Sequence, residues 1–223
     1  MNCIVTAGPT YEPLDEARRL TNFSTGKLGT LLANFLVERG HQVTLLIGSS
    51  ATVREKSFAQ KIETFTTSDD LLVRLRNLSG ENFDAIFHAA AVSDFKFGRV
   101  FSRHDSGELC EINSGKFSTR EGNLLAELVP TAKIISSLRT QFPRAKVVGW
   151  KYEVEGHRDD VLQKAAAQIL ENKTDACVAN GPAYGLGFGL VEGNDESAHF
   201  ARREDLFLAL EKLIGVEKSS LPN

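Results

Sequence analysis

The chain alternates between short, almost wholly apolar runs and longer segments in which apolar residues recur with a helical period. The apolar runs lie at residues 3–7, 42–47, 62–65, 84–89, 146–150 and 175–179, with a weaker run at 197–201. The helical segments lie at residues 27–38, 69–78, 132–140, 159–170 and 203–213. Apolar runs without polar alternation are typical of strands covered on both faces, and strands that alternate with helices are typical of parallel sheets. The pattern therefore predicts the α/β class, with a doubly wound, mostly parallel Rossmann-like sheet.

Local signals mark helix ends and one long insertion. Ser68 precedes two acidic residues and is expected to cap the second helix, and Gly40 is expected to follow the end of the first. Residues 90–131 come after the fourth strand with little periodicity, and a segment of this length is seldom a passive connection. We expect a flap or β-arm at about 93–128, within one domain that spans residues 1–223.

Composition narrows the choice of partners and compartment. The 223 residues are 42% hydrophobic, enough for a full core, and carry a formal net charge of −3. This balance supplies no broad basic surface, so we expect no nucleic acid as a partner. The three cysteines show no CxxC spacing, the N-terminus lacks a signal sequence, and no run of about 18 apolar residues occurs. We therefore expect a cytoplasmic protein with no membrane partner.

The loops that follow the strands are the first places to look for a ligand, because ligands of open α/β sheets bind beyond the carboxyl ends of the strands. Gly8 and Thr10 follow the first strand, where glycine allows a close approach and a hydroxyl can donate to a phosphate oxygen. A plain turn explains them equally well. The loop is not a dinucleotide fingerprint, since GxGxxG is absent, and Gly26-Lys27 lacks the other residues of a P-loop.

The stretch RRLTNFSTGKLG, residues 18–29, leads into the first helix and is mostly polar. Free amides and the helix dipole at a helix N-terminus favour an anion, so this stretch predicts a phosphate or carboxylate cradle. Ordinary capping by Ser24 or Thr25 is the simpler alternative, but it leaves Asn22 and the two arginines before it unexplained. The cradle would be formed by side chains and amides of Asn22, Ser24, Thr25, Gly26 and Lys27, with Arg18 and Arg19 close by.

Two further segments carry candidate chemistry. The fourth strand ends in a run of small residues that includes Ala90 and Ala91 and leads to Asp94, which suits a ligand lying against the backbone, although tight packing also selects small residues. Lys116 lies between a glycine and two hydroxyl residues in the flap, where a mobile cation can meet a polyphosphate, although a lone loop lysine is usually only solvated. The five histidines show no ligand spacing, so we assign no metal-binding residues.

Together these stretches resemble the phosphopantothenoylcysteine synthetase family, which acts in coenzyme A biosynthesis. The resemblance spans nearly the whole chain in order, and its first segment is the most specific. The matching segments are TAGPTYEPLDEARRLTNFSTGKLG (6–29), AAAVSDF (89–95), GKFS (115–118), LVPTAKII (128–135), VVGWKYE (147–153) and DACVAN (175–180). A flavin-dependent decarboxylase often precedes this domain, and because the chain begins at the first strand we expect none here.

The resemblance implies a reaction and a set of roles. In this family the carboxylate of 4′-phosphopantothenate attacks the α-phosphate of CTP or ATP, pyrophosphate leaves, and the amine of cysteine displaces the nucleotide. Asn22 and Lys116 match the catalytic positions. The implied substrate-binding residues are Arg18, Ser24, Thr25, Gly26, Lys27 and Ala91, and the implied nucleotide-binding residues are Gly8, Thr10, Ala90, Asp94, Lys133, Ile134, Trp150 and Asn180. Mg²⁺ held mainly by the nucleotide and a homodimer are implied as well.

The chain departs from the family pattern near the expected base site. Trp150 replaces a phenylalanine, and Gln168 and Asn172 lie near positions where many bacterial members carry lysines, with Lys164 and Lys173 out of register. We expect residues 185–189 to close over the base or to form a surface loop. The alternatives are a non-catalytic nucleotide-binding homologue and a nicotinamide-dependent reductase. The reductase would need a glycine-rich turn and a YxxxK pair, which the sequence lacks.

Overall fold

A central β-sheet organises the computed structural model, which describes residues 1–104, 106–193 and 196–215. In that part of the chain the sheet has eight strands, in the order β13-β12-β11-β10-β6-β1-β4-β5. Six of these strands, β1, β4, β5, β6, β10 and β11, are parallel to one another. At one edge β12 pairs antiparallel with β11, and β13 pairs antiparallel with β12. The strands are β1 (Asn2–Ala7), β4 (Gln42–Gly48), β5 (Lys61–Phe65), β6 (Ala85–His88), β10 (Lys146–Tyr152), β11 (Ala176–Asn180), β12 (Phe188–Glu192) and β13 (Ser197–Phe200).

The strand order reverses between β1 and β6. The chain runs outward from β1 through β4 to β5 and then returns to the other side of β1 at β6. Such a reversal opens a crevice at the carboxyl ends of the two strands, which is the usual ligand position in doubly wound sheets. The predicted fold class is thus confirmed.

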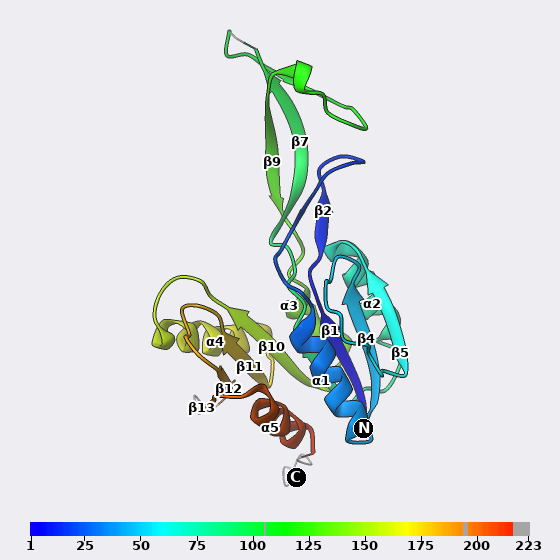
Figure 1. The fold of residues 1–223 in the computed structure, drawn as a ribbon, viewed down its shortest axis with the longest axis vertical. Helices are drawn as coiled ribbons and strands as arrows, with labels where there is room; N and C mark the ends of the chain where they lie inside the picture. The colour runs from blue at the N-terminus through cyan, green and yellow to red at the C-terminus, as the bar shows by residue number, and fades with distance from the viewer. Residues whose placement is uncertain (105, 194–195, 216–223) are drawn as a thin grey trace.

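Helices cover both faces of the sheet (Figure 1). The helices α1 (Lys27–Glu38) and α5 (Arg203–Gly215) pack on one face, and α2 (Ser68–Leu78), α3 (Ile134–Gln141) and α4 (Arg158–Asn172) pack on the other. Alternate residues of β1 serve the two faces: Val5 packs with α1 and α5, whereas Ile4 packs with α2 and α3. Burial on both faces explains why the strands read as continuous apolar runs.

A long β-arm projects from the sheet, as Figure 1 shows. It spans residues 95–130 and contains β7 (Phe95–Arg103), β8 (Leu109–Glu111), the short 3₁₀ helix η1 (Thr119–Glu121) and β9 (Asn123–Pro130), with β7 between the other two strands. A hairpin of β2 (Tyr11–Pro13) and β3 (Arg19–Thr21) lies near its base. Among the arm residues whose burial is described, only Val100, Ser102 and Phe117 are buried. The arm is therefore held by backbone pairing far more than by a core.

Three local expectations have clear outcomes. Gly40 follows α1 with a φ of +84°, as expected for a residue that ends a helix. The expected cap at Ser68 is wrong by one residue: Thr67 Oγ1 accepts from the amide of Asp70 at 3.1 Å, and Ser68 begins the helix with its own amide donating to Glu12 at 2.9 Å. Strand β12 was missed, since it occupies part of a segment expected to be a loop.

No helix in the described part of the chain combines the length and the apolar character needed to cross a bilayer.

Candidate functional site

The loops after β1 and β6 are joined by backbone hydrogen bonds at the strand-order reversal. The amide of Thr10 donates to Ala91 O at 3.0 Å, and the amide of Ala91 donates to Gly8 O at 3.0 Å. Thr10 is buried, and its hydroxyl accepts from the amide of Ser93 at 2.8 Å. Three predicted site residues thus come together, while the Thr10 hydroxyl already fixes the neighbouring loop.

The buried side chain of His88 contacts the same loop through Thr6. The Thr6 hydroxyl accepts from the amide of Ala90 at 3.1 Å and lies 2.9 Å from Nδ1 of His88. Burial lowers the pKa of His88 to about 4, so the imidazole is neutral near pH 7, and its tautomer sets which of the two groups donates in the Thr6 contact. His88 was not singled out from the sequence, because the Thr6 contact spans 82 residues of chain.

Asn22 lies against the loop that follows β6. Its Nδ2 donates to Ala91 O at 3.0 Å, and the preceding Thr21 donates from its hydroxyl to Thr10 O at 2.9 Å. These contacts fix the β2–β3 hairpin over the crevice. Asn22 and Ala91, which are 69 residues apart in sequence, are thus brought into one site.

Helix α1 begins at Lys27, as expected from the sequence, directly after the segment predicted to form a cradle. Gly26 has a φ of +78°, and a Cβ at this position would lie 3.3 Å from the Cα of Gly8. The two glycines therefore let the loops before α1 and after β1 touch. The N-cap is Gly26, and no side chain caps the helix from that position, so capping by Ser24 or Thr25 is wrong. Oγ1 of Thr25, one residue earlier, accepts from the amide of Lys27 at 3.2 Å.

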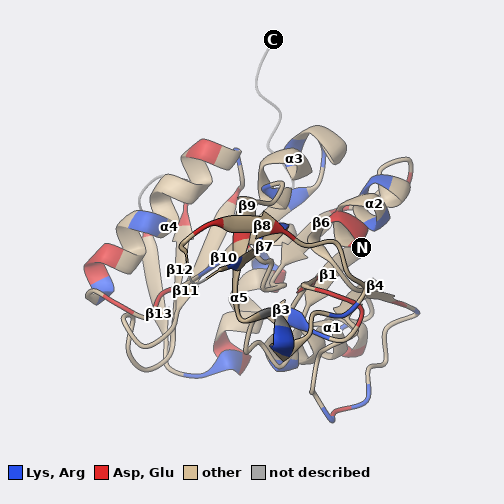
Figure 2. Cartoon of the chain, turned by 90° about the horizontal axis from the view of Figure 1, so that it is seen from above, with Lys and Arg blue, Asp and Glu red and all other residues tan. Residues whose placement is uncertain are grey.

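A hollow of about 390 Å³ opens beside the start of α1, lined by Thr25, Lys27, Thr52, Val53, Arg54 and Glu55. The ammonium of Lys27 lies 3.1 Å from a carboxylate oxygen of Glu55, and this contact lowers the pKa of Glu55. Figure 2 shows basic segments at β3 and at the start of α1. An anion at the cradle would therefore meet positive charge, part of which Glu55 already balances.

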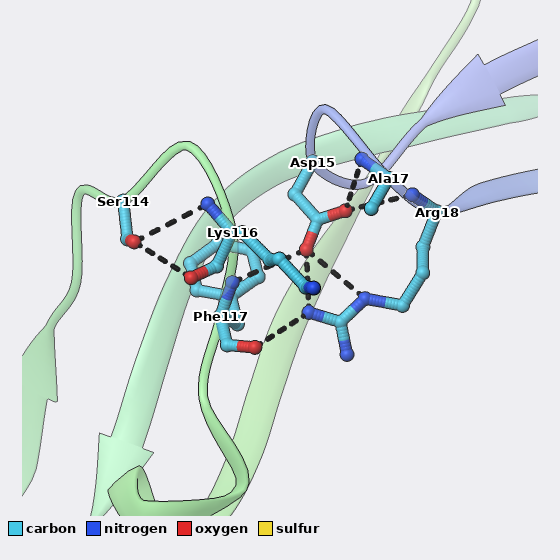
Figure 3. Close-up of polar contacts among 6 residues, drawn as sticks. All are labelled: Asp15, Ala17, Arg18, Ser114, Lys116 and Phe117. Atoms are coloured by element: carbon cyan, nitrogen blue, oxygen red, sulfur yellow. Dashed lines mark hydrogen bonds and ion pairs between the residues drawn. The ribbon is translucent and has the colours of Figure 1, made fainter.

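The arm returns to the β2–β3 hairpin through a cluster around Asp15 (Figure 3). The Asp15 carboxylate accepts from Nε and Nη2 of Arg18 and from the amide of Phe117, and Arg18 Nη2 also donates to Phe117 O at 2.9 Å. Arg18, a predicted substrate-binding residue, is thus engaged with the arm. Lys116 precedes Phe117, and its side chain is exposed beside this cluster.

The predicted nucleotide-binding residues divide between two sides of the sheet. Trp150 packs against the cluster of α1 and α5, and the alternation along β11 places Asn180 on that face as well. Lys133 and Ile134 lie at the start of α3 on the opposite face, where the Lys133 ammonium is 3.6 Å from a carboxylate oxygen of Glu171. Asp94 is exposed, and its backbone carbonyl accepts from the amide of Thr131, shortly before α3.

Two polar atoms near the predicted base site have no hydrogen-bond partner within the described chain. They are the indole Nε1 of Trp150, a donor, and the carbonyl oxygen of the Asn180 side chain, an acceptor. On α4, Gln168 donates to Sγ of Cys177 at 3.2 Å, Asn172 is buried, and Lys164 donates to Glu153 at 2.6 Å. These residues of α4 are thus engaged in the fold.

No group of three or more His, Cys, Asp or Glu side chains placed to hold a metal ion occurs among the described residues.

The fold and the site define a class before any comparison. A sheet in this strand order, with glycine turns and a helix N-terminus at its reversal, is that of Rossmann-like α/β proteins. The chain belongs to the family described as the DNA/pantothenate metabolism flavoprotein C-terminal domain, whose sequence profile matches residues 1–206.

Curated relatives and solved structures agree with this assignment. The chain is 35% identical over 178 residues to the coenzyme A biosynthesis bifunctional protein CoaBC of Thermococcus kodakarensis, covering 79% of this chain and 40% of the relative. It is 30% identical over 189 residues to the Bacillus subtilis CoaBC, covering 83% and 42%. The chain thus spans about two fifths of the length of these relatives.

Among solved structures, the DNA/pantothenate metabolism flavoprotein of Streptococcus pneumoniae superposes with a TM-score of 0.82 at 26% identity, covering 96% of this chain and 99% of that one. The C-terminal domain of a CoaBC protein superposes with a TM-score of 0.73 at 21% identity, covering 96% and 93%, which shows the shared fold.

Proposed function

We propose that the protein is a phosphopantothenate–cysteine ligase, which joins 4′-phosphopantothenate to L-cysteine. The reaction would pass through an acyl-nucleotide made from CTP, with ATP as the alternative nucleotide. It would release pyrophosphate and a nucleoside monophosphate. Membership of the family and relatives named for coenzyme A biosynthesis support this proposal. The observation that carries it is the contact of Asn22 with Ala91 O, at 3.0 Å, beside the N-terminus of α1.

The proposed chemistry needs alignment and charge stabilisation more than it needs a strong base. The substrate carboxylate is already ionised and attacks the α-phosphate without losing a proton. The amide of Asn22 would then orient the acyl-phosphate, while the amides at the start of α1 stabilise its charge. The cysteine amine attacks the acyl carbon, and the nucleoside monophosphate leaves with the electrons of the cleaved C–O bond.

Lys116 would supply positive charge to the triphosphate, because it is exposed on the arm next to the β2–β3 hairpin. Mg²⁺, when bound, would neutralise phosphate charge. Among the predicted site residues Asp94 carries a carboxylate and is exposed, so it would be available to such an ion.

A homodimer belongs to the same proposal. Large apolar side chains are exposed on the hairpin and the arm, among them Leu20, Phe23, Phe95, Leu128 and Val129. Phe23 lies within the cradle segment and is fully exposed. A second copy that covers this surface would remove these side chains from water and bring two cradles near the interface. Light scattering during size-exclusion chromatography tests this, since a monomer at micromolar concentration would contradict it.

A non-catalytic nucleotide-binding homologue is the second candidate. It is favoured by α4, where Gln168 and Asn172 are engaged within the fold and Lys164 is paired with Glu153. Such a protein would bind a nucleotide without releasing pyrophosphate.

The test is pyrophosphate release that depends on phosphopantothenate, measured separately with CTP and with ATP. We expect kcat/KM for CTP to exceed that for ATP by at least about tenfold, a margin that one or two hydrogen bonds to the base supply. Equal use of both nucleotides would refute the preference for CTP. No pyrophosphate with either nucleotide, although binding is detected, would favour the non-catalytic homologue.

A further inference from the structure

We propose that Asp15 is a positioning residue for Lys116, which it holds against the hairpin that carries Asn22. This inference deepens the proposed function and rests on it. Asp15 contacts Arg18, a predicted substrate-binding residue, and the arm segment that carries Lys116, so it would act by holding these groups in place. The Asp15 carboxylate joins two distant parts of the chain, because it accepts from the amide of Phe117, 102 residues away in sequence.

The Asp15 side chain is completely buried, whereas that of its partner Arg18 is 46% exposed. One oxygen accepts from the amides of Ala17 and Arg18 at 2.9 and 2.7 Å. The other accepts from the Arg18 guanidinium and, at 3.2 Å, from the amide of Phe117. The Arg18 contact and the backbone amides hold the pKa of Asp15 well below its usual range. The carboxylate is therefore ionised and bonded to both the hairpin and the arm.

The same arm segment is fixed at both sides of Lys116. The amide of Glu16 donates to Gly115 O at 3.0 Å, and Arg18 donates to Phe117 O at 2.9 Å. Phe117 is one of the few buried residues of the arm, and the Arg18 guanidinium lies 5.9 Å from the centre of its ring. The backbone of Lys116 is thus held on both sides while its side chain extends into solvent.

This part of the arm contacts the hairpin through polar groups. A Cβ at Gly115 would lie 3.1 Å from a carboxylate oxygen of Glu16, so the hairpin and the arm already approach as closely as a glycine allows. None of the three hydrophobic clusters of the body contains an arm residue, within the described chain. Replacing Asp15 should therefore free residues 114–118 without unfolding the sheet.

The experiment compares Asp15→Asn with Glu127→Gln in the full chain. Glu127 also pairs with an arginine of the arm, Arg99 at 2.8 Å, and its hydrogen bonds go to that arginine and not to Phe117 or Arg18, so it is a matched control. Asparagine keeps the size of Asp15 but places an amide group against the donors of Arg18 and Phe117. Hydrogen exchange by mass spectrometry should show faster exchange at residues 114–118 in Asp15→Asn only. Unchanged exchange there would refute the anchoring.

The kinetic part of the test uses a double-mutant cycle with Lys116→Gln. We expect Asp15→Asn alone to lower kcat at least about tenfold with little change in KM, because a charged contact of the transition state is misplaced. In the Lys116→Gln background the same change should cost less than about threefold, since the residue it positions is already absent. Equal losses in both backgrounds would show that Asp15 does not act through Lys116.

Phe117→Ala keeps the test decisive if Asp15→Asn fails to fold. It loosens the arm side of the contact and leaves the turn at residues 15–18 intact. The same local exchange and the same dependence on Lys116 are expected, and their absence would overturn the proposal. A chain that lacks ligase activity but shows the local exchange would refute the proposed function and leave the anchoring by Asp15 standing.

Discussion

Gly29→Ala should destabilise the protein, although alanine is the better helix former. Gly29 lies in the first turn of α1, and a Cβ there would lie 2.6 Å from Cβ of Ala7 and 3.2 Å from Thr6 O. Both neighbours belong to β1 and are buried, so no rotamer change relieves the contact. Overpacking of this kind costs about 1–3 kcal/mol, against a helix-propensity gain of about 1 kcal/mol. We expect a net loss of up to about 2 kcal/mol, with α1 displaced from β1.

The control is the same substitution at Gly80. A Cβ there would meet no atom within 4 Å, and Gly80 does not have a positive φ. Gly80→Ala should therefore stabilise the protein by about 0.4–1 kcal/mol, through the unfolded chain. Urea unfolding followed by circular dichroism measures both changes. If Gly29→Ala proves as stable as the parent, the close packing of α1 on β1 is not rigid and the reasoning fails.

Two further changes probe the site directly. Asn22→Asp should leave pyrophosphate release nearly intact and slow formation of the cysteine product, because a carboxylate repels the acyl-phosphate. Equal losses in both measurements, or no loss in either, would contradict the role of Asn22. His88→Gln should flatten the pH dependence of stability: the pKa of His88 falls from 6.5 to about 4 on folding, so stability present above pH 6.5 is lost as the pH drops towards 4. Between pH 7 and 4.5 the parent should lose about 2.5 kcal/mol more than the variant, measured by urea unfolding, and equal slopes would contradict a neutral His88.

The parallel sheet was predictable because each strand is buried on both faces. In β1 every residue from Cys3 to Ala7 is buried, and the run is apolar except for Thr6, whose hydroxyl is hydrogen-bonded. Strand β12 was missed because Gly189 and the two glycines just before the strand suggest a loop. A Cβ at Gly189 would lie 2.8 Å from the Tyr184 ring, so that glycine serves packing inside a strand. A flap or β-arm was expected in this segment, but its individual strands were not assigned, because with few buried residues β7 and β9 carry no period that burial would impose.

The candidate site was predictable only segment by segment. The cradle at residues 22–27 and the lysine at 116 each carry a local signal, namely a helix start and a glycine-flanked cation. What joins the segments carries none, because the contact of Asn22 with Ala91 and that of Asp15 with Phe117 depend on long-range folding. Nor does the sequence show that Trp150 and Lys133 lie on opposite faces of the sheet, which follows from how β10 and α3 pack.

The division between a buried sheet and an exposed arm separates stability from activity in this protein. The three hydrophobic clusters lie between the sheet and its helices and contain no described residue of the arm. Global unfolding therefore reports on substitutions such as Gly29→Ala, whereas it should scarcely register the loss of the Asp15 anchor. Local hydrogen exchange reports on the arm, because segments with few buried contacts open at lower free energy than the core. A variant with an unchanged unfolding midpoint and a much lower kcat is thus the result that this architecture predicts for any residue that acts only by holding the arm.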